Sequence, residues 1–152
     1  MAALKATLRA DLTDAMKAKE AFRTQTLRMA LAAIANEEVA GKAARELTEA
    51  QERQVVTREV RKRRDSAEVY GAAGRAELAA KETAEADLLA GYLPAALTDA
   101  ELDAVVAEEV ANAPGATLKQ MGVVIKAVNA RVQGRADGSA VAAKVKAALS
   151  AA

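Results

Sequence analysis

The sequence predicts an all-α fold, and three observations support that prediction. The chain is rich in Ala, Leu, Glu, Lys, Arg and Gln, which have the highest helix propensities. Only two prolines interrupt its 152 residues, so long helices are possible. No stretch alternates apolar and polar residues with period two over the length of a strand. With two Tyr, one Phe and no Trp, the core must be built from aliphatic side chains.

Apolar residues at helical spacing predict the two N-terminal helices. The first helix carries Leu4, Leu8, Leu12 and Met16. The second has Phe22 at its entry and carries Leu27, Leu31 and Ile34. We expect the second helix to end near Gly41.

A helical hairpin is predicted next. Thr48 and Gln51 have the spacing of a capping box, which opens a third helix running to about Tyr70. A short turn follows at Gly71 to Gly74. The fourth helix carries Leu78, Leu88, Leu89 and Tyr92. It must stop before Pro94, because the residue before a proline is pushed out of the α region.

Three helices are predicted after Pro94, which makes seven in all. The fifth begins with a capping box at Thr98 and Glu101, flanked by a hydrophobic staple of Leu97 and Leu102, and runs to about Val110. Thr117 and Gln120 cap the sixth helix. Asp137 is the expected N-cap of the last helix. We predict a larger N-terminal helical domain over residues 1–94 and a smaller three-helix bundle over residues 95–152.

Composition argues against catalysis by the chain alone. It contains no Cys and no His, which removes thiol chemistry, the usual general base and the commonest metal ligands. One possible nucleophile pair is Ser139 with Lys144, but Ser139 lies in the first turn of a predicted helix, and we favour that structural interpretation. The carboxylates show no metal-ligand spacing, although an all-carboxylate site stays open. We therefore expect no catalytic residue, no metal and no cofactor.

The N-terminus and the apolar runs argue against membrane targeting. Residues 1–12 have no apolar core or cleavage site, so no signal peptide is predicted. No apolar run approaches the ~20 residues that span a bilayer. We expect a cytoplasmic protein with no membrane partner.

Charge is distributed in blocks along the chain. Residues 1–64 carry a net charge of +5, residues 65–113 carry −9, and residues 114–152 carry +5. Basic blocks can bind phosphates, whereas solvated helices also carry blocks of charge. For the arginine-rich third helix we favour the solvated interpretation. The near absence of aromatic residues disfavours base stacking, so RNA would be contacted through its shape and backbone.

The turn at residues 134–138 (Gly-Arg-Ala-Asp-Gly) has two interpretations. Its glycines allow close approach of a ligand, the following helix N-terminus favours anions, and Arg135 offers a fork for phosphate. Alternatively, it is a tight turn with an N-cap. The residues alone leave both interpretations open.

A buried ion pair is predicted in the third and fourth helices. At roughly 100° per residue, Arg63 and Glu85 each fall in the middle of an apolar stripe. Counting from the turn places them at similar heights in the hairpin. We expect them to pair and to set its register, the alternative being that Arg63 reaches solvent and Glu85 pairs with Lys81.

Three segments together resemble the GatB/YqeY family, and in particular its stand-alone YqeY-like members. They are residues 62–66 (Lys-Arg-Arg-Asp-Ser), residues 85–94 (Glu-Ala-Asp-Leu-Leu-Ala-Gly-Tyr-Leu-Pro), and residues 121–126 (Met-Gly-Val-Val-Ile-Lys) together with the turn at 134–138. The resemblance implies kinship with the tail domain of the B subunit of the glutamine-dependent aspartyl/glutamyl-tRNA amidotransferase. That tail grips the outer corner of tRNA.

The resemblance also implies a contact surface and a function. Transferred by position, the tRNA- or anion-binding surface consists of Lys119, Gly122, Lys126, Arg131, Gly134, Arg135 and Gly138. Carbon–nitrogen ligase activity with glutamine as amido donor belongs to the complex, whose catalytic parts are missing here. We expect a non-catalytic accessory protein that binds tRNA or a translation-related partner through residues 95–152. Two alternatives stay open: an accessory component in a complex with amidotransferase subunits, and a protein–protein adaptor that docks through its acidic block.

Overall fold

The structure, a computed structural model, describes residues 3–151. Over that range it contains seven α-helices, one short 3₁₀ helix and no strand, which confirms the all-α prediction. The chain divides between Leu93 and Pro94 into two compact units, the N-terminal unit and the C-terminal unit, which are described separately.

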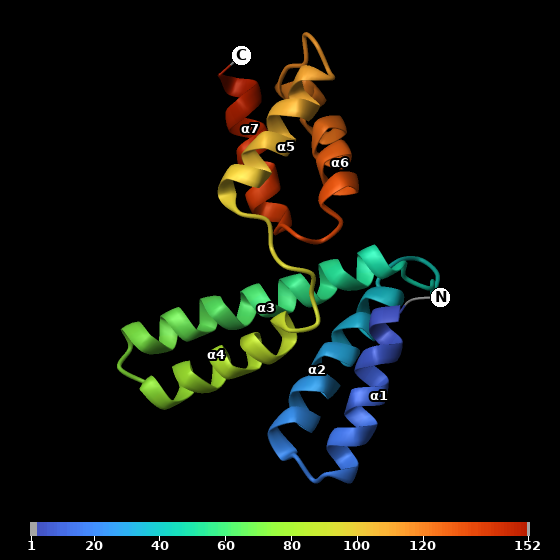
Figure 1. Ribbon diagram of the computed structural model, residues 1–152, viewed down its shortest axis with the longest axis vertical. Helices are drawn as coiled ribbons and strands as arrows, with labels where there is room; N and C mark the ends of the chain where they lie inside the picture. The colour runs from blue at the N-terminus through green and yellow to red at the C-terminus, as the bar shows by residue number, and fades with distance from the viewer. Residues whose placement is uncertain (1–2, 152) are drawn as a thin grey trace. The chain divides into compact units, whose positions relative to one another are not determined.

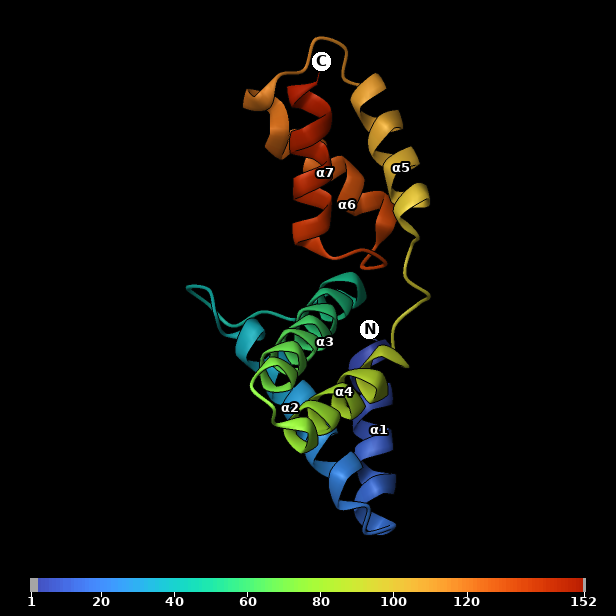
Figure 2. The same cartoon turned by 90° about the vertical axis from the view of Figure 1, so that its left-hand side faces the viewer.

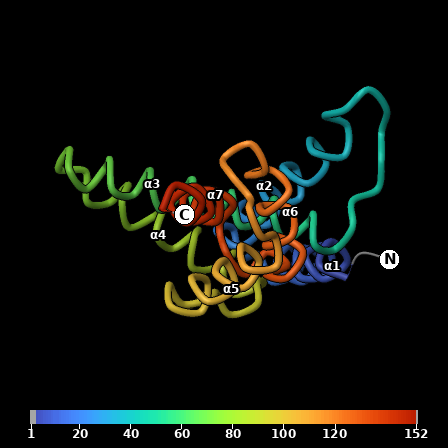
Figure 3. The backbone as a smooth tube through the Cα atoms, turned by 90° about the horizontal axis from the view of Figure 1, so that it is seen from above, coloured from blue at the N-terminus to red at the C-terminus, as the bar shows by residue number. Residues whose placement is uncertain are grey.

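The N-terminal unit is made of two helical hairpins. Helices α1 (Ala3–Lys17) and α2 (Ala21–Glu38) pack against each other, and α3 (Glu49–Ala72) lies side by side with α4 (Ala76–Ala90) (Figure 1). The turn between α1 and α2 places Lys19 in the left-handed region, with φ of 58°. Figure 3 traces the connection between α2 and α3 as a wide loop.

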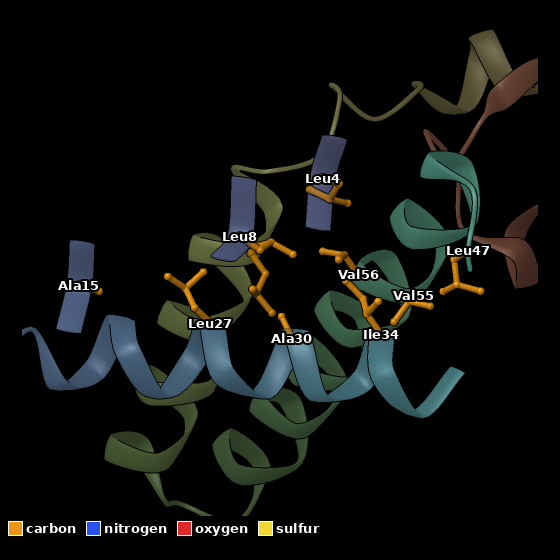
Figure 4. Packing of buried hydrophobic residues seen from close by; sticks show 10 residues of the cluster. Leu4, Leu8, Ala15, Leu27, Ala30, Ile34, Leu47, Val55 and Val56 are labelled. Atoms are coloured by element: carbon orange, nitrogen blue, oxygen red, sulfur yellow. The ribbon is translucent and has the colours of Figure 1, made fainter. Parts of the chain in front are cut away.

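Aliphatic side chains from all four helices form the core of this unit. Leu8 of α1 faces Leu27 and Ala30 of α2, and Val56 of α3 approaches Ile34 (Figure 4). Leu89 brings α4 into the same cluster, and Tyr92 and Leu93 pack against it. The last residues before Pro94 are therefore anchored to the N-terminal core.

The C-terminal unit is a bundle of α5 (Asp99–Ala111), α6 (Met121–Val132) and α7 (Gly138–Ser150), with the 3₁₀ helix η1 (Leu118–Gln120) leading directly into α6 (Figure 2). The buried residues of its core are Leu and Val, namely Leu102, Val106, Val124, Val128, Val132, Val141, Val145 and Leu149. These residues recur at helical spacing, as the sequence predicts.

The capping predictions have mixed outcomes. Thr48 with Gln51, and Thr98 with Glu101, form reciprocal capping boxes. Thr117 with Gln120 forms one too, but it caps η1, so α6 starts later than predicted. Asp137 is the N-cap residue of α7, as predicted, although its side chain makes no cap hydrogen bond.

Two apolar residues that the sequence places on buried helix faces are exposed in the structure. Met16 is 49% exposed and Leu78 is 39% exposed, although both were assigned to buried stripes. Ala15 is buried in place of Met16. A perfect spacing of four drifts around a helix that has 3.6 residues per turn, so the fourth member of such a series leaves the buried face.

No helix within residues 3–151 is both long enough and apolar enough to cross a membrane.

Candidate functional site

The arginines of α3 are held by carboxylates. Their partners lie on α3 itself, on α2 and on α4, at 3.1 to 3.8 Å: Arg53 with Glu49, Arg58 with Glu37, Arg61 with Asp65, and Arg64 with Asp87. Most of these side chains are exposed, where an ion pair contributes little stability but does lower the local positive potential. The pairing supports the solvated interpretation of this helix.

Arg63 differs from its neighbours because it is buried. Its Nε lies 3.3 Å from Oε2 of Glu85, and both side chains are less than a tenth exposed. The predicted ion pair is thus present in the structure. The geometry between Nε–H and the carboxylate is too poor for a hydrogen bond, so this contact is electrostatic.

The strongest contact of Arg63 is one that the sequence reasoning missed. Its Nη1 donates to Oε2 of Glu59 at 2.8 Å and to the Glu59 carbonyl oxygen at 3.1 Å. Glu59 precedes Arg63 by four residues, which is the spacing of a favourable helical ion pair, so the sequence contains the information needed to predict this contact. One buried cation therefore sits between two carboxylates.

A second buried acid, Glu52, has a structural role. Its Oε1 accepts a hydrogen bond at 3.1 Å from the backbone N–H of Lys5, in the first turn of α1. The Lys5 ammonium pairs with Glu38 at 2.7 Å. Burial raises the pKa of Glu52, and the Lys5 hydrogen bond opposes that rise. Glu52 thus caps α1 from another helix, a contact that no local spacing reveals.

The basic C-terminal block is largely neutralised within its own unit. Residues 94–152 contain six basic and six acidic residues, so the unit is neutral overall. Arg131 of α6 contacts Glu108 at 2.7 Å and Glu109 at 3.3 Å, both on α5. Arg131, a candidate phosphate contact, therefore links α6 to α5 through these ion pairs.

Lys144 is also engaged by α5. Its Nζ lies 2.7 Å from Asp103 and 3.7 Å from Asp99. The hydrogen bond that the Lys144 ammonium donates to Asp103 raises the pKa of Lys144. A general base for Ser139 would need the opposite shift.

The turn between α6 and α7 is a tight turn with a left-handed helix end, as one of the two interpretations predicts. Gln133 and Gly134 have φ of 47° and 81°, so α6 ends with two residues in the left-handed region, where glycine is favoured. The Nε of Arg135 donates to the Ala95 carbonyl oxygen at 3.0 Å. Arg135 is exposed apart from that bond, and its terminal nitrogens lie beyond the donor that is used. Gly138 is the exposed first residue of α7.

The remaining candidates share one exposed face at the start of α6. Lys119, Gly122 and Lys126 are spaced by three and four residues, so they lie on the same side of the η1–α6 segment. Within the described chain, no carboxylate forms an ion pair with either lysine. A Cβ added at Gly122 would meet no atom within 4 Å. We call Lys119, Gly122 and Lys126 the α6 face.

Apolar residues border the α6 face. Leu118 is 50% exposed, and Val123, next to Gly122, is 70% exposed. The sequence reasoning did not select either residue, because apolar residues near a helix start are normally assigned to the core. Over residues 3–151, no group of three or more acidic side chains is placed to hold a metal ion.

One protein-family model matches most of the chain. The model of the Yqey-like protein family matches residues 5–149, which spans both units. The chain belongs to the Yqey-like protein family. No curated protein matches it significantly. The family description names no ligand.

Proposed function

We propose that this Yqey-like protein is a non-catalytic accessory protein that binds tRNA through its C-terminal unit. The observation that supports the proposal is the α6 face, where two lysines without carboxylate partners flank an exposed glycine. Lysines on one side of a helix can each neutralise a phosphate. A glycine without steric neighbours lets a sugar–phosphate backbone approach the helix closely.

The geometry favours structured RNA over single strands. All three aromatic residues of the chain, Phe22, Tyr70 and Tyr92, belong to the N-terminal unit. The C-terminal unit therefore has no ring on which an unpaired base could stack. A helix that presents lysines and small side chains suits the wide, shallow minor groove of A-form RNA and its flanking phosphates.

The test is a titration of tRNA with the full chain over a range of salt concentrations. Replacing both Lys119 and Lys126 with Ala should weaken binding. It should also reduce the slope of log K against log salt by roughly 1.5, because two phosphate contacts are lost. The matched control replaces Lys17 and Lys42 with Ala, which removes the same charge from exposed sites in the N-terminal unit. An equal loss in both variants would mean nonspecific attraction and would reject the α6 face.

A second candidate function is the binding of a protein partner on the same segment. The exposed Leu118 and Val123 favour it, because exposed apolar side chains beside a helix start add contact area in protein interfaces. Replacing Val123 with Ser should then abolish capture of the partner with little effect on tRNA affinity. The role of a ligase component would require glutamine-dependent transfer that appears only after other subunits are added.

A further inference from the structure

The connection between the two units is short and is held at both ends. On the N-terminal side, Leu93 packs against the core of its unit, and its N–H donates to the Ala90 carbonyl oxygen at 3.1 Å. On the C-terminal side, Leu97 packs against the core of the C-terminal unit. Residues 94–96 lie between these two anchors.

Arg135 holds this connection with both its main chain and its side chain. Its carbonyl oxygen accepts from the Leu97 N–H at 2.9 Å, and its Nε donates to the Ala95 carbonyl oxygen at 3.0 Å. The turn that carries Arg135 is itself fixed, because the Arg135 N–H donates to the Val132 carbonyl oxygen at 2.9 Å. Ala95 and Leu97 are therefore both hydrogen-bonded to the turn between α6 and α7.

We propose that Arg135 is a latch that sets the length of the hinge between the units. When the side chain holds Ala95, only Pro94 lies between the last residue anchored to one unit and the first residue held by the other. Proline has a fixed φ and restricts the residue before it, so this hinge is stiff. When the side chain lets go, Ala95 and Ala96 join the hinge, which then has three residues.

The latch also connects the hinge to ligand binding, a step that rests on the proposed function. The guanidinium is one rigid plane with five donors, so Nε can hold Ala95 while the terminal nitrogens contact a phosphate. A phosphate bound there orders the Arg135 side chain and stabilises the closed latch. Because coupling between two equilibria is reciprocal, closing the latch must increase RNA affinity by the same factor by which RNA binding favours the closed latch.

The first test compares the full-length wild-type chain with the Arg135→Lys variant by NMR relaxation and amide exchange. Lysine keeps the charge but lacks a donor at the Nε position. We expect an order parameter of about 0.85 for the Ala96 amide in the wild type and below ~0.6 in the variant. Exchange of the Leu97 amide should become about fivefold faster, the effect of one lost hydrogen bond. The control is Arg131→Lys, the same change at a residue whose ion pairs are with Glu108 and Glu109 of α5, and it should leave both values unchanged.

Unchanged values for Arg135→Lys, or equal changes in both variants, would overturn the latch. The second arm adds tRNA to the wild type and is expected to slow Leu97 exchange further. If tRNA binds without that slowing, the coupling is wrong although the proposed function stands. If the titration shows no binding, the proposed function and the coupling both fail, while the relaxation data of the free protein still decide the latch.

Discussion

Buried Arg63 faces two carboxylates, one from buried Glu85 and one from partly buried Glu59. Burying charge costs free energy, and the attraction within this cluster of three side chains only offsets that cost. The cluster is best understood as a constraint on register. If α4 slid along α3 by one turn, Glu85 would lose its cation while staying in the apolar interface.

Replacing Arg63 with Met should destabilise the protein by ~3–5 kcal/mol, because two carboxylates would be left without a cation. Urea unfolding with a double-mutant cycle measures this effect. Adding Glu85→Gln to Arg63→Met should recover part of the loss, since the uncompensated charge is then removed. A loss below about 1 kcal/mol for Arg63→Met would show that the cluster is well solvated.

Glu52 predicts a pH dependence with a defined sign. Its folded-state pKa is raised by burial, so the folded state binds its proton more tightly than the unfolded state does. Its contribution to stability is therefore fully present below the ordinary value of 4.5 and is lost as pH rises through the raised pKa.

The Glu52→Gln variant tests that sign, because Gln keeps an oxygen to accept from the Lys5 N–H. Its stability relative to wild type should be constant in acid and should increase as pH rises from about 4.5 upward. Denaturant unfolding at a series of pH values measures the difference. A difference that is flat with pH would mean that the Glu52 pKa is not shifted by folding.

At the scale of the elements, Gly122 stands out because it lowers the stability of α6 at a position where a larger side chain would fit. Glycine lowers helix stability relative to alanine, and no neighbour within 4 Å would obstruct a Cβ here. Nothing in the packing of the unit explains this glycine. Close approach by a partner would explain it, and the proposed binding surface on the α6 face therefore includes Gly122.

Replacing Gly122 with Ala should therefore raise stability by about 0.4–1 kcal/mol and weaken tRNA binding. A thermal melt gives the first quantity, and the tRNA titration gives the second, for which we expect a loss of about fivefold or more, equivalent to ~1 kcal/mol. The control is Ala130→Ser, a change of similar size at an exposed position of α6 that lies eight residues after Gly122. If Gly122→Ala raises stability but leaves tRNA affinity unchanged, Gly122 is not part of the binding surface.

The elements also show which features the sequence could predict. The capping boxes of α3 and α5, and the pairing of Arg63 with Glu85, follow from spacing along one or two helices. The partners of Arg131 and Arg135 do not, because Glu108 and Ala95 reach them only through the packing of α5 against α6 and the path of the chain after Pro94. Within the candidate surface, Arg131 and Arg135 therefore have partners in their own unit, whereas Lys119 and Lys126 form no ion pair within the described chain.

At the scale of the whole molecule, each unit has its own hydrophobic core. We predict that residues 1–93 and residues 94–152 fold as separate fragments. The smaller fragment should be the less stable one, because a domain of that size buries a smaller share of its surface. Circular dichroism melts of both fragments measure this. A C-terminal fragment without a cooperative transition would show that its fold depends on the rest of the chain.

The most direct test of the central claim is an NMR titration of the full chain with tRNA, followed through its backbone amides. The account predicts that shifts and line broadening concentrate at residues 118–126, with a smaller response at Arg135. The arginine-rich stretch of α3 should respond little, because its arginines are already paired with carboxylates. Perturbations centred on α3, or none at saturating tRNA, would contradict the proposal that the α6 face binds RNA.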